Sequence, residues 1–170
     1  MSDLSEKLME YLRRRKEDRG FMANLRCALV DSKRSRAWPL LAWCNGIGDD
    51  YRALTIQYVA GFFATHPKDD AAAGNFGDTC RQLMDDDERA RLHSVQEAGP
   101  LSRRFQHLLA AEDDEIFKRL LRFVMRCKSK DIPINYLQLF NDLKQWQYGP
   151  DVVRTRWAKS FWASEAEDVL

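Results

Sequence analysis

The sequence predicts an all-α protein, either one compact bundle of roughly eight helices or two small helical lobes that share a core. Hydrophobic residues make up 45% of the 170 residues, which is enough to bury a sizeable core. The chain contains only 8 glycines and 5 prolines, the residues that most often interrupt helices. Apolar residues recur at helical spacing and rarely alternate with polar ones, so helices are favoured over strands. We expect a single helical domain over residues 1–170.

The first half of the chain divides into helices at clear breaks. Gly20 is expected to separate the first two helices, and the Asp50 carboxylate is expected to cap the third. His66-Pro67 should end that third helix, because a residue before proline avoids helical backbone angles. The expected helices of this half span residues 4–18, 21–29 and 51–65.

The second half carries stronger start and stop signals. The acidic run Asp85–Glu88 should open a helix, since acids favour the positive end of the helix dipole. Gly99-Pro100 is a break, Asp113 can cap a long helix, and Pro133 suits a first helical position. The expected helices of this half span residues 76–84, 85 onward, 101–109, 114–128, 133–146 and 150 onward.

Several classes of protein are excluded by composition. The chain is charged from its third residue, so we expect no signal peptide. Its longest apolar stretch, residues 53–64, is too short to cross a bilayer. The 4 cysteines are far apart in the sequence and form no CxxC pair. We therefore expect a cytoplasmic protein with reduced thiols and no membrane partner.

The residues that could support catalysis are scattered. His66, His93 and His107 lack metal-binding spacing, and no Cys/His cluster accompanies them. The acids of Asp85–Glu88 point in different directions on a helix, so they are poorly placed to converge on one Mg²⁺ ion. Gly46-Ile47-Gly48 is a GxG without a preceding strand. We expect no enzyme activity and no cofactor.

Charge is strongly segregated along a chain whose net charge is only +1. Residues 67–115 contain 6 Lys or Arg against 12 Asp or Glu, whereas residues 116–162 contain 10 against 3. On the helix near residue 120, one broad arc is apolar, including Leu121 and Met125, and the remaining arc is expected to be purely cationic. We interpret this cationic arc as a nucleic-acid-binding stripe, comprising Lys118, Arg119, Arg122 and Arg126, with Lys130 closing the helix.

Two further basic groups could extend this surface. One contains Arg19 and Arg26, after the run Arg13–Lys16; a cluster of cations at a helix end is an equally good explanation of that run. The other surrounds Trp157 near the end of the chain and comprises Arg154, Arg156 and Lys159. Core packing is the simpler interpretation of the 5 tryptophans, although one or two could stack on bases.

Several short motifs of the chain are similar to those of one known family. Residues 19–26 read Arg-Gly-Phe-Met-Ala-Asn-Leu-Arg, and residues 75–83 contain a glycine in a predicted helix. These stretches resemble the RGxxAxLR motif and the central helix of the CasB family, the small subunit of the type I-E CRISPR Cascade complex. The ending is the most specific part: Asp142-Leu143 and Trp146 are similar to the family's DL..W, and residues 153–162 are similar to its VR..WA..FY. Trp162 departs from the usual tyrosine of that last motif.

The resemblance implies a non-catalytic, antiviral-defence subunit that works within an RNA-guided complex. Its implied partners are the target and displaced DNA strands, the CRISPR RNA-containing complex with its backbone and large subunits, and a second copy of the chain. The implied role is to stabilise the R-loop. The alternative is a pure scaffold whose basic faces dock acidic protein surfaces. A metal-dependent nuclease is a third possibility, but it lacks ligands in this sequence.

Overall fold

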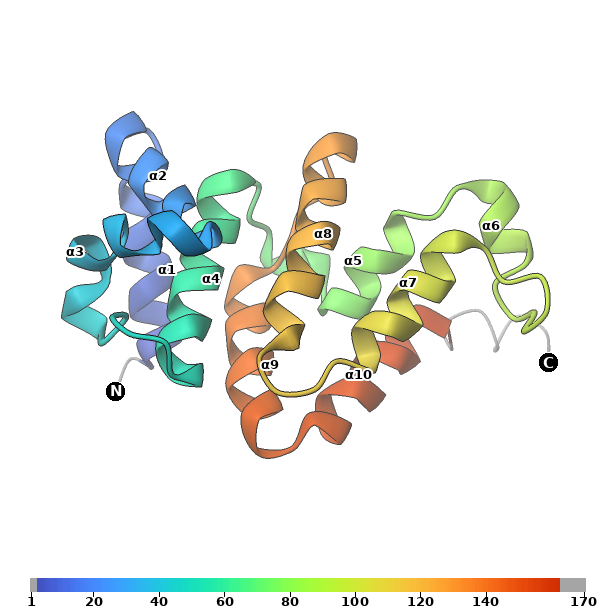
Figure 1. The fold of residues 1–170 in the computed structure, drawn as a ribbon. Helices are drawn as coiled ribbons and strands as arrows, with labels where there is room; N and C mark the ends of the chain where they lie inside the picture. Colours follow the sequence, from blue (N-terminus) through green and yellow to red (C-terminus); the bar gives the residue numbers. More distant parts are fainter. Residues whose placement is uncertain (1–2, 163–170) are drawn as a thin grey trace.

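The computed structural model describes residues 3–162 and confirms the all-α fold, with ten α-helices and four 3-10 helices in that range. Figure 1 shows α1 to α4 on one side, α8 and α9 in the centre, and α5 to α7 on the other side. One isolated bridge joins Asp69 to Ile134. The elements are α1 (Leu4–Arg14), α2 (Arg19–Arg26), η1 (Cys27–Leu29), η2 (Asp31–Arg36), α3 (Trp38–Leu41), η3 (Ala42–Cys44), α4 (Tyr51–Thr65), η4 (Ala71–Ala73), α5 (Phe76–Gln82), α6 (Asp86–Ala90), α7 (Pro100–Leu109), α8 (Glu115–Lys130), α9 (Tyr136–Tyr148) and α10 (Pro150–Trp162).

Helix α4 is the most deeply buried element and organises the N-terminal helices. It is buried on all sides from Ala53 to Thr65, because α2, η1, α8 and α9 pack around it. The Asp50 side chain accepts a hydrogen bond from the Ala53 amide at 2.9 Å, which confirms the expected cap. The helix ends at Thr65, before His66-Pro67, as predicted. One continuous hydrophobic cluster runs from Leu8 in α1 to Phe161 in α10.

Three sequence-based boundaries are wrong. Gly20 lies inside the first turn of α2 instead of ending a helix; the first helix has already ended at Arg14. Pro133 does not begin α9, which starts at Tyr136 after the Asn135 side chain caps it through the Gln138 amide. Asp113 does not cap α8. It has a left-handed φ of 50°, and the helix begins at Glu115.

The acidic run opens α6 as expected and also supports α7. Asp85 accepts a hydrogen bond from the Glu88 amide at 2.8 Å, so it caps α6. Glu88 is only 5% exposed, and its carboxylate accepts from the Leu101 amide at 2.9 Å, at the start of α7. The run therefore builds two helix starts, which is the structural interpretation favoured by the sequence.

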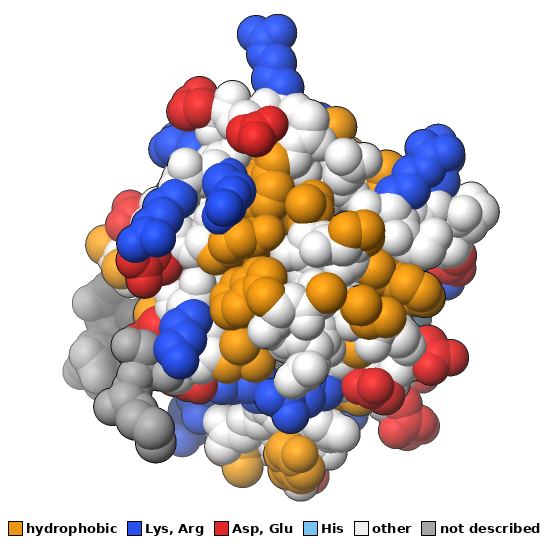
Figure 2. Space-filling view, turned by 90° about the vertical axis from the view of Figure 1, so that its left-hand side faces the viewer, with side chains coloured by type: hydrophobic (Ala, Val, Ile, Leu, Met, Phe, Trp, Pro, Cys, Tyr) orange, Lys and Arg blue, Asp and Glu red, His pale blue; other side chains and the backbone are white. Residues whose placement is uncertain are grey.

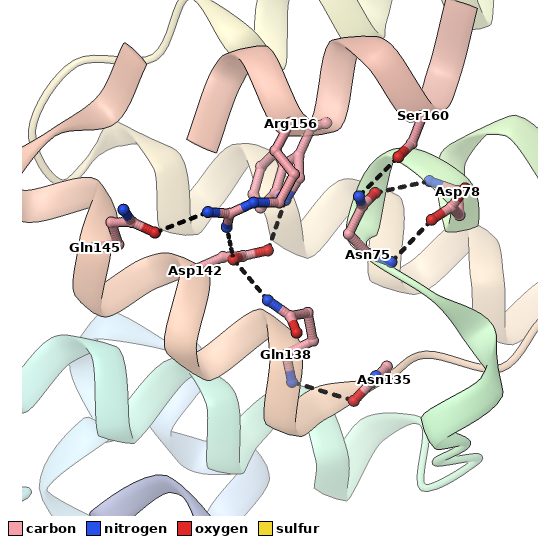
Figure 3. Close-up of polar contacts among 9 residues, drawn as sticks. Asn75, Asp78, Asn135, Gln138, Asp142, Gln145, Arg156 and Ser160 are labelled. Carbon is pink, nitrogen blue, oxygen red and sulfur yellow. Dashed lines mark hydrogen bonds and ion pairs between the residues drawn. The ribbon is translucent and has the colours of Figure 1, made fainter. Parts of the chain in front are cut away.

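A buried carboxylate on α9 joins three side chains (Figure 3). Asp142 is 1% exposed and accepts a hydrogen bond from Trp157 Nε1 at 2.8 Å. Arg156 forms an ion pair with the same carboxylate, and Gln138 Nε2 donates to it at 2.9 Å. Because a buried carboxylate is costly unless it is paired and hydrogen-bonded, this network fixes α10 against α9.

Helices α5 and α10 pack backbone to backbone at Gly77. A Cβ atom at this position would lie 2.1 Å from the carbonyl oxygen of Trp157, well inside any real contact. The glycine is therefore required by the backbone-to-backbone packing of the two helices. This contact explains why the helix that begins at Phe76 contains a glycine at its second position.

Gly77→Ala is expected to lower the free energy of unfolding by about 1–3 kcal/mol, because the added methyl group cannot be accommodated without moving α10. Urea unfolding of the variant measures the loss. The matched control is Gly20→Ala, where the nearest atom to an added Cβ lies 3.7 Å away. That change should be neutral or stabilising. Equal stability of the two variants would contradict the packing described here.

Arg156→Ala is expected to destabilise the protein by about 1–3 kcal/mol, because it removes a charged partner from the buried Asp142 carboxylate. Lys159→Ala on the same helix is the control. Lys159 is exposed and should contribute less than about 0.5 kcal/mol. Thermal unfolding followed by circular dichroism compares the two. Similar melting temperatures for both variants would show that Arg156 is not a structural residue.

Candidate nucleic-acid interface

The orientation of α8 is set by its apolar side. Phe117 stacks on Tyr58 of α4 with ring centroids 4.9 Å apart and 7° between the planes, and Tyr51 contacts the same ring at 5.1 Å. Leu120 and Val124 are fully buried on this side. Side chains at the other positions of the helix must therefore point away from α4.

The outward arginines of α8 meet α7 in a cationic pocket of about 310 Å³. Of the residues described, no Asp or Glu lines it. Its apolar wall is Phe123, which is 4% exposed. Three of its arginines belong to the predicted stripe and come from successive turns of α8. The lining residues are Arg104, His107, Arg119, Arg122, Phe123 and Arg126.

The arginines of this cationic pocket differ in whether their side chains bond to other residues of the protein. Arg119 is tied down, since it donates to Glu115 at 2.8 Å and to the carbonyl oxygen of His107 at 2.6 Å. The side chains of Arg104, Arg122 and Arg126 make no hydrogen bond or ion pair with any residue from 3 to 162. Three guanidinium groups thus remain available to an anion, and each can donate two parallel hydrogen bonds to a phosphate.

Arg104 and His107 were not among the residues selected from the sequence. The signal that could have found them is the amphipathic pattern of α7, where Leu101, Phe105 and Leu108 are buried while Arg103, Arg104, Gln106 and His107 are exposed. That pattern gives the outward direction of Arg104. The pattern does not indicate that α7 and α8 lie side by side. Only the folded structure shows that the cations of the two helices meet.

The two lysines of the stripe lie outside the cationic pocket. Lys118 pairs with Asp31 of η2 at 3.2 Å, and Lys118 lowers the pKa of that carboxyl. Lys130 donates to the carbonyl oxygen of Leu83 at 2.9 Å, which anchors the end of α8 to the segment after α5. Lys118 remains well exposed despite its pairing.

The basic residues near the chain ends are not brought to this pocket. Arg154 donates to the carbonyl oxygens of Leu109 and Ala111 at 2.6 and 2.7 Å, so it anchors the end of α7 to α10. Arg156 belongs to the Asp142 network, whereas Lys159 is exposed on α10. On α2, Arg19 is exposed and Arg26 donates to the carbonyl oxygen of Ala64.

Other chemistry is sparse over residues 3–162. They contain no group of three or more His, Cys, Asp or Glu side chains placed to hold a metal ion. None of their helices is both long and apolar enough to cross a membrane. The four cysteines are free; Cys44, Cys80 and Cys127 are buried, and Cys27 is partly exposed. Burial raises the pKa of Cys44 to about 11.

A separate surface on the N-terminal helices is apolar. Figure 2 shows hydrophobic side chains gathered across the middle of this face, with both basic and acidic side chains around them. Trp43 and Ile47, in the segment that joins α3 to α4, are each 47% exposed. Exposed apolar patches of this kind mark protein contacts more often than ligand sites.

Comparisons with known proteins agree with this architecture. CasB from Thermus thermophilus has a TM-score of 0.73 and 20% identity, covering 96% of this chain and all of that one. CasB from M. ruber has a TM-score of 0.73 and 22% identity, covering 99% and 98%. A chain of a CRISPR RNA-guided surveillance complex has a TM-score of 0.69 and 17% identity, covering 98% of both.

At these identities the structural similarities establish the fold alone. No curated protein matches the sequence. The family model of the CRISPR-associated protein Cse2 matches residues 21–162, which include nearly all of α2 and the whole of α3 to α10, and therefore both helices of the cationic pocket. The chain therefore belongs to the Cse2 family of CRISPR-associated proteins.

Proposed function

We propose that this protein is a non-catalytic small subunit of a CRISPR RNA-guided surveillance complex, and that it binds DNA strands through the cationic pocket between α7 and α8. The observation that carries the proposal is the set of three unpaired arginines, Arg104, Arg122 and Arg126, in one pocket without a carboxylate among the described residues. Family membership and the likeness to a chain of such a complex support the assembly.

The physical role is to stabilise an opened duplex. Replacing a DNA duplex with an RNA–DNA hybrid is nearly balanced in free energy, so contacts to the strand backbone decide the outcome. Arginines that contact phosphates bind every sequence alike, because phosphates carry no base identity. Such contacts would hold the target or displaced strand apart and so stabilise the R-loop.

The proposed interface is narrower than the set of cations selected from the sequence. Arg122 and Arg126 form its centre together with Arg104 of α7, and Arg119 fixes its geometry through Glu115. Lys118 extends it along α8. The remaining cations, Arg19, Arg26, Lys130, Arg154, Arg156 and Lys159, contribute at most long-range attraction, which salt screens.

Partner subunits are expected on other faces. The apolar surface of the N-terminal helices (Figure 2) suits a protein contact. A second pocket, of about 590 Å³, is acidic, with Asp49, Glu112, Asp113 and Asp114 among its lining residues, and suits a basic partner surface. The backbone subunits, the large subunit and a second copy of this chain are the candidate occupants. These contacts are compatible with strand binding at the cationic pocket.

The double variant Arg122→Gln with Arg126→Gln is expected to weaken binding of a single-stranded oligonucleotide and to flatten its salt dependence. For each phosphate that is no longer neutralised, the slope of log affinity against log salt should become shallower by about 0.7. Fluorescence anisotropy across a salt series measures both effects. The matched control is Lys7→Gln with Arg52→Gln, which removes two exposed cations from α1 and α4.

The two variants distinguish a local site from general attraction. Equal losses in both would mean that net charge alone drives binding. Unchanged affinity and slope in the Arg122/Arg126 variant, with helical circular dichroism retained, would favour a pure scaffold. The proposal requires a larger loss in the Arg122/Arg126 variant, and a similar loss for unrelated sequences.

A further inference from the structure

The exposed face of α8 is not purely cationic, contrary to the sequence-based expectation. Met125 is 47% exposed, and Leu121 is partly exposed. Leu121 and Met125 are four residues apart, as are Lys118 and Arg122, so the helix presents an apolar row beside a cationic row. The apolar row has no partner on α8 itself.

The segment around η1 and η2 supplies the opposite wall. Val30 is extended, with φ −114° and ψ 114°, and is 45% exposed between the two 3-10 helices. Arg34 holds this segment in place by donating to the Ala28 carbonyl oxygen at 3.0 Å and to the Tyr58 hydroxyl at 2.9 Å. The Lys118–Asp31 pair, at 3.2 Å, bridges the segment to α8.

The space between them is an open groove of about 510 Å³, here called the apolar groove. Its lining is mainly apolar and includes Leu29, Val30 and Leu121, with Lys118 and Arg122 at its edge and Asp31 and Ser32 on the η2 side. Arg122 also lines the cationic pocket. The apolar groove therefore adjoins the proposed phosphate site at the Arg122 side chain.

We propose that the apolar groove accepts an unstacked nucleobase from the single strand whose phosphates bind in the cationic pocket. The proposal rests on the proposed function. A nucleotide joins an anionic phosphate to a flat, largely apolar base, which matches a cationic pocket beside an apolar groove. In a duplex the base faces are stacked inside and cannot reach the groove, so the site selects single strands.

The charges around the apolar groove favour a base over a phosphate on its η2 side. The Asp31 carboxylate is held by Lys118 at 3.2 Å and by Arg34 at 2.8 Å. It repels phosphate, whereas it can accept hydrogen bonds from the N–H groups of bases, including the ring N3–H of thymine. The cations of the Arg122 side attract phosphate instead. The strand is thus oriented, with its backbone toward α7 and its base toward η2.

The experiment compares two single strands that carry the same number of phosphates. One is oligo(dT), and the other has the same backbone with abasic residues in place of the thymidines. Fluorescence anisotropy of the full chain measures each affinity. The wild-type protein should bind oligo(dT) about three- to tenfold more tightly than the abasic strand, because only the former covers the apolar groove. Val30→Ser with Leu121→Ser, which changes two apolar side chains of the groove lining, should reduce oligo(dT) binding toward the abasic level and leave abasic binding unchanged.

Ile47→Ser with Val95→Ser is the matched control, since these side chains are 47% and 91% exposed on other surfaces. It should leave both affinities unchanged. Circular dichroism and the melting temperature check that each variant is folded.

Four results would overturn the inference. Equal wild-type affinity for the two strands would show that no base is bound, while the proposed function would stand. An equal loss for both strands in the Val30/Leu121 variant would assign these residues to support of the phosphate site. Unchanged strand binding by that variant, combined with its failure to enter the assembled complex, would assign the groove to a protein partner. Binding of neither strand by the wild type would remove the proposed function as well.

Discussion

The contact of Phe117 with Tyr51 and Tyr58 determines the rotation of α8, and with it the direction of every cation on that helix. Burial of the ring against α4 leaves Arg122 and Arg126 to point toward α7, where Arg104 meets them. The same rotation leaves Met125 exposed and places Leu121 in the lining of the apolar groove, beside Asp31 and Ser32 of η2. A change at Phe117 would therefore disturb the cationic pocket and the apolar groove together, although it lines neither.

Much of the fold could be predicted from the sequence because its signals are local. Asp50 and His66-Pro67 bound α4 as expected, and Asp85 opens α6. The candidate site was harder to predict from the sequence, because it depends on which helices pack side by side. The periodicity of α8 indicated its stripe but placed Met125 on the buried side, since an apolar residue does not reveal whether a neighbour reaches it. Arg104 acquires its role only when α7 packs beside α8.

For two arginines near the C-terminal end, the sequence suggested a binding role that the structure does not support. In the sequence, Arg154 and Arg156 look like further cations of a binding surface. In the structure, Arg154 satisfies carbonyl oxygens at the end of α7, and Arg156 neutralises the buried Asp142. An arginine can thus serve the fold or a ligand, and its partners decide which. The cationic pocket and the acidic pocket share no lining residue, so the proposed DNA and protein contacts would lie at different places on the surface.

The most direct test of strand binding at the cationic pocket is an NMR titration of the arginine Nε–H groups with a short single strand. We predict that the resonances of Arg104, Arg122 and Arg126 shift most, because their guanidinium groups have no partner within residues 3–162. Those of Arg154 and Arg156 should stay in place, since each is bonded within the fold. Shifts confined to Arg19 and Arg26 of α2, or no shifts at all, would contradict strand binding at this pocket.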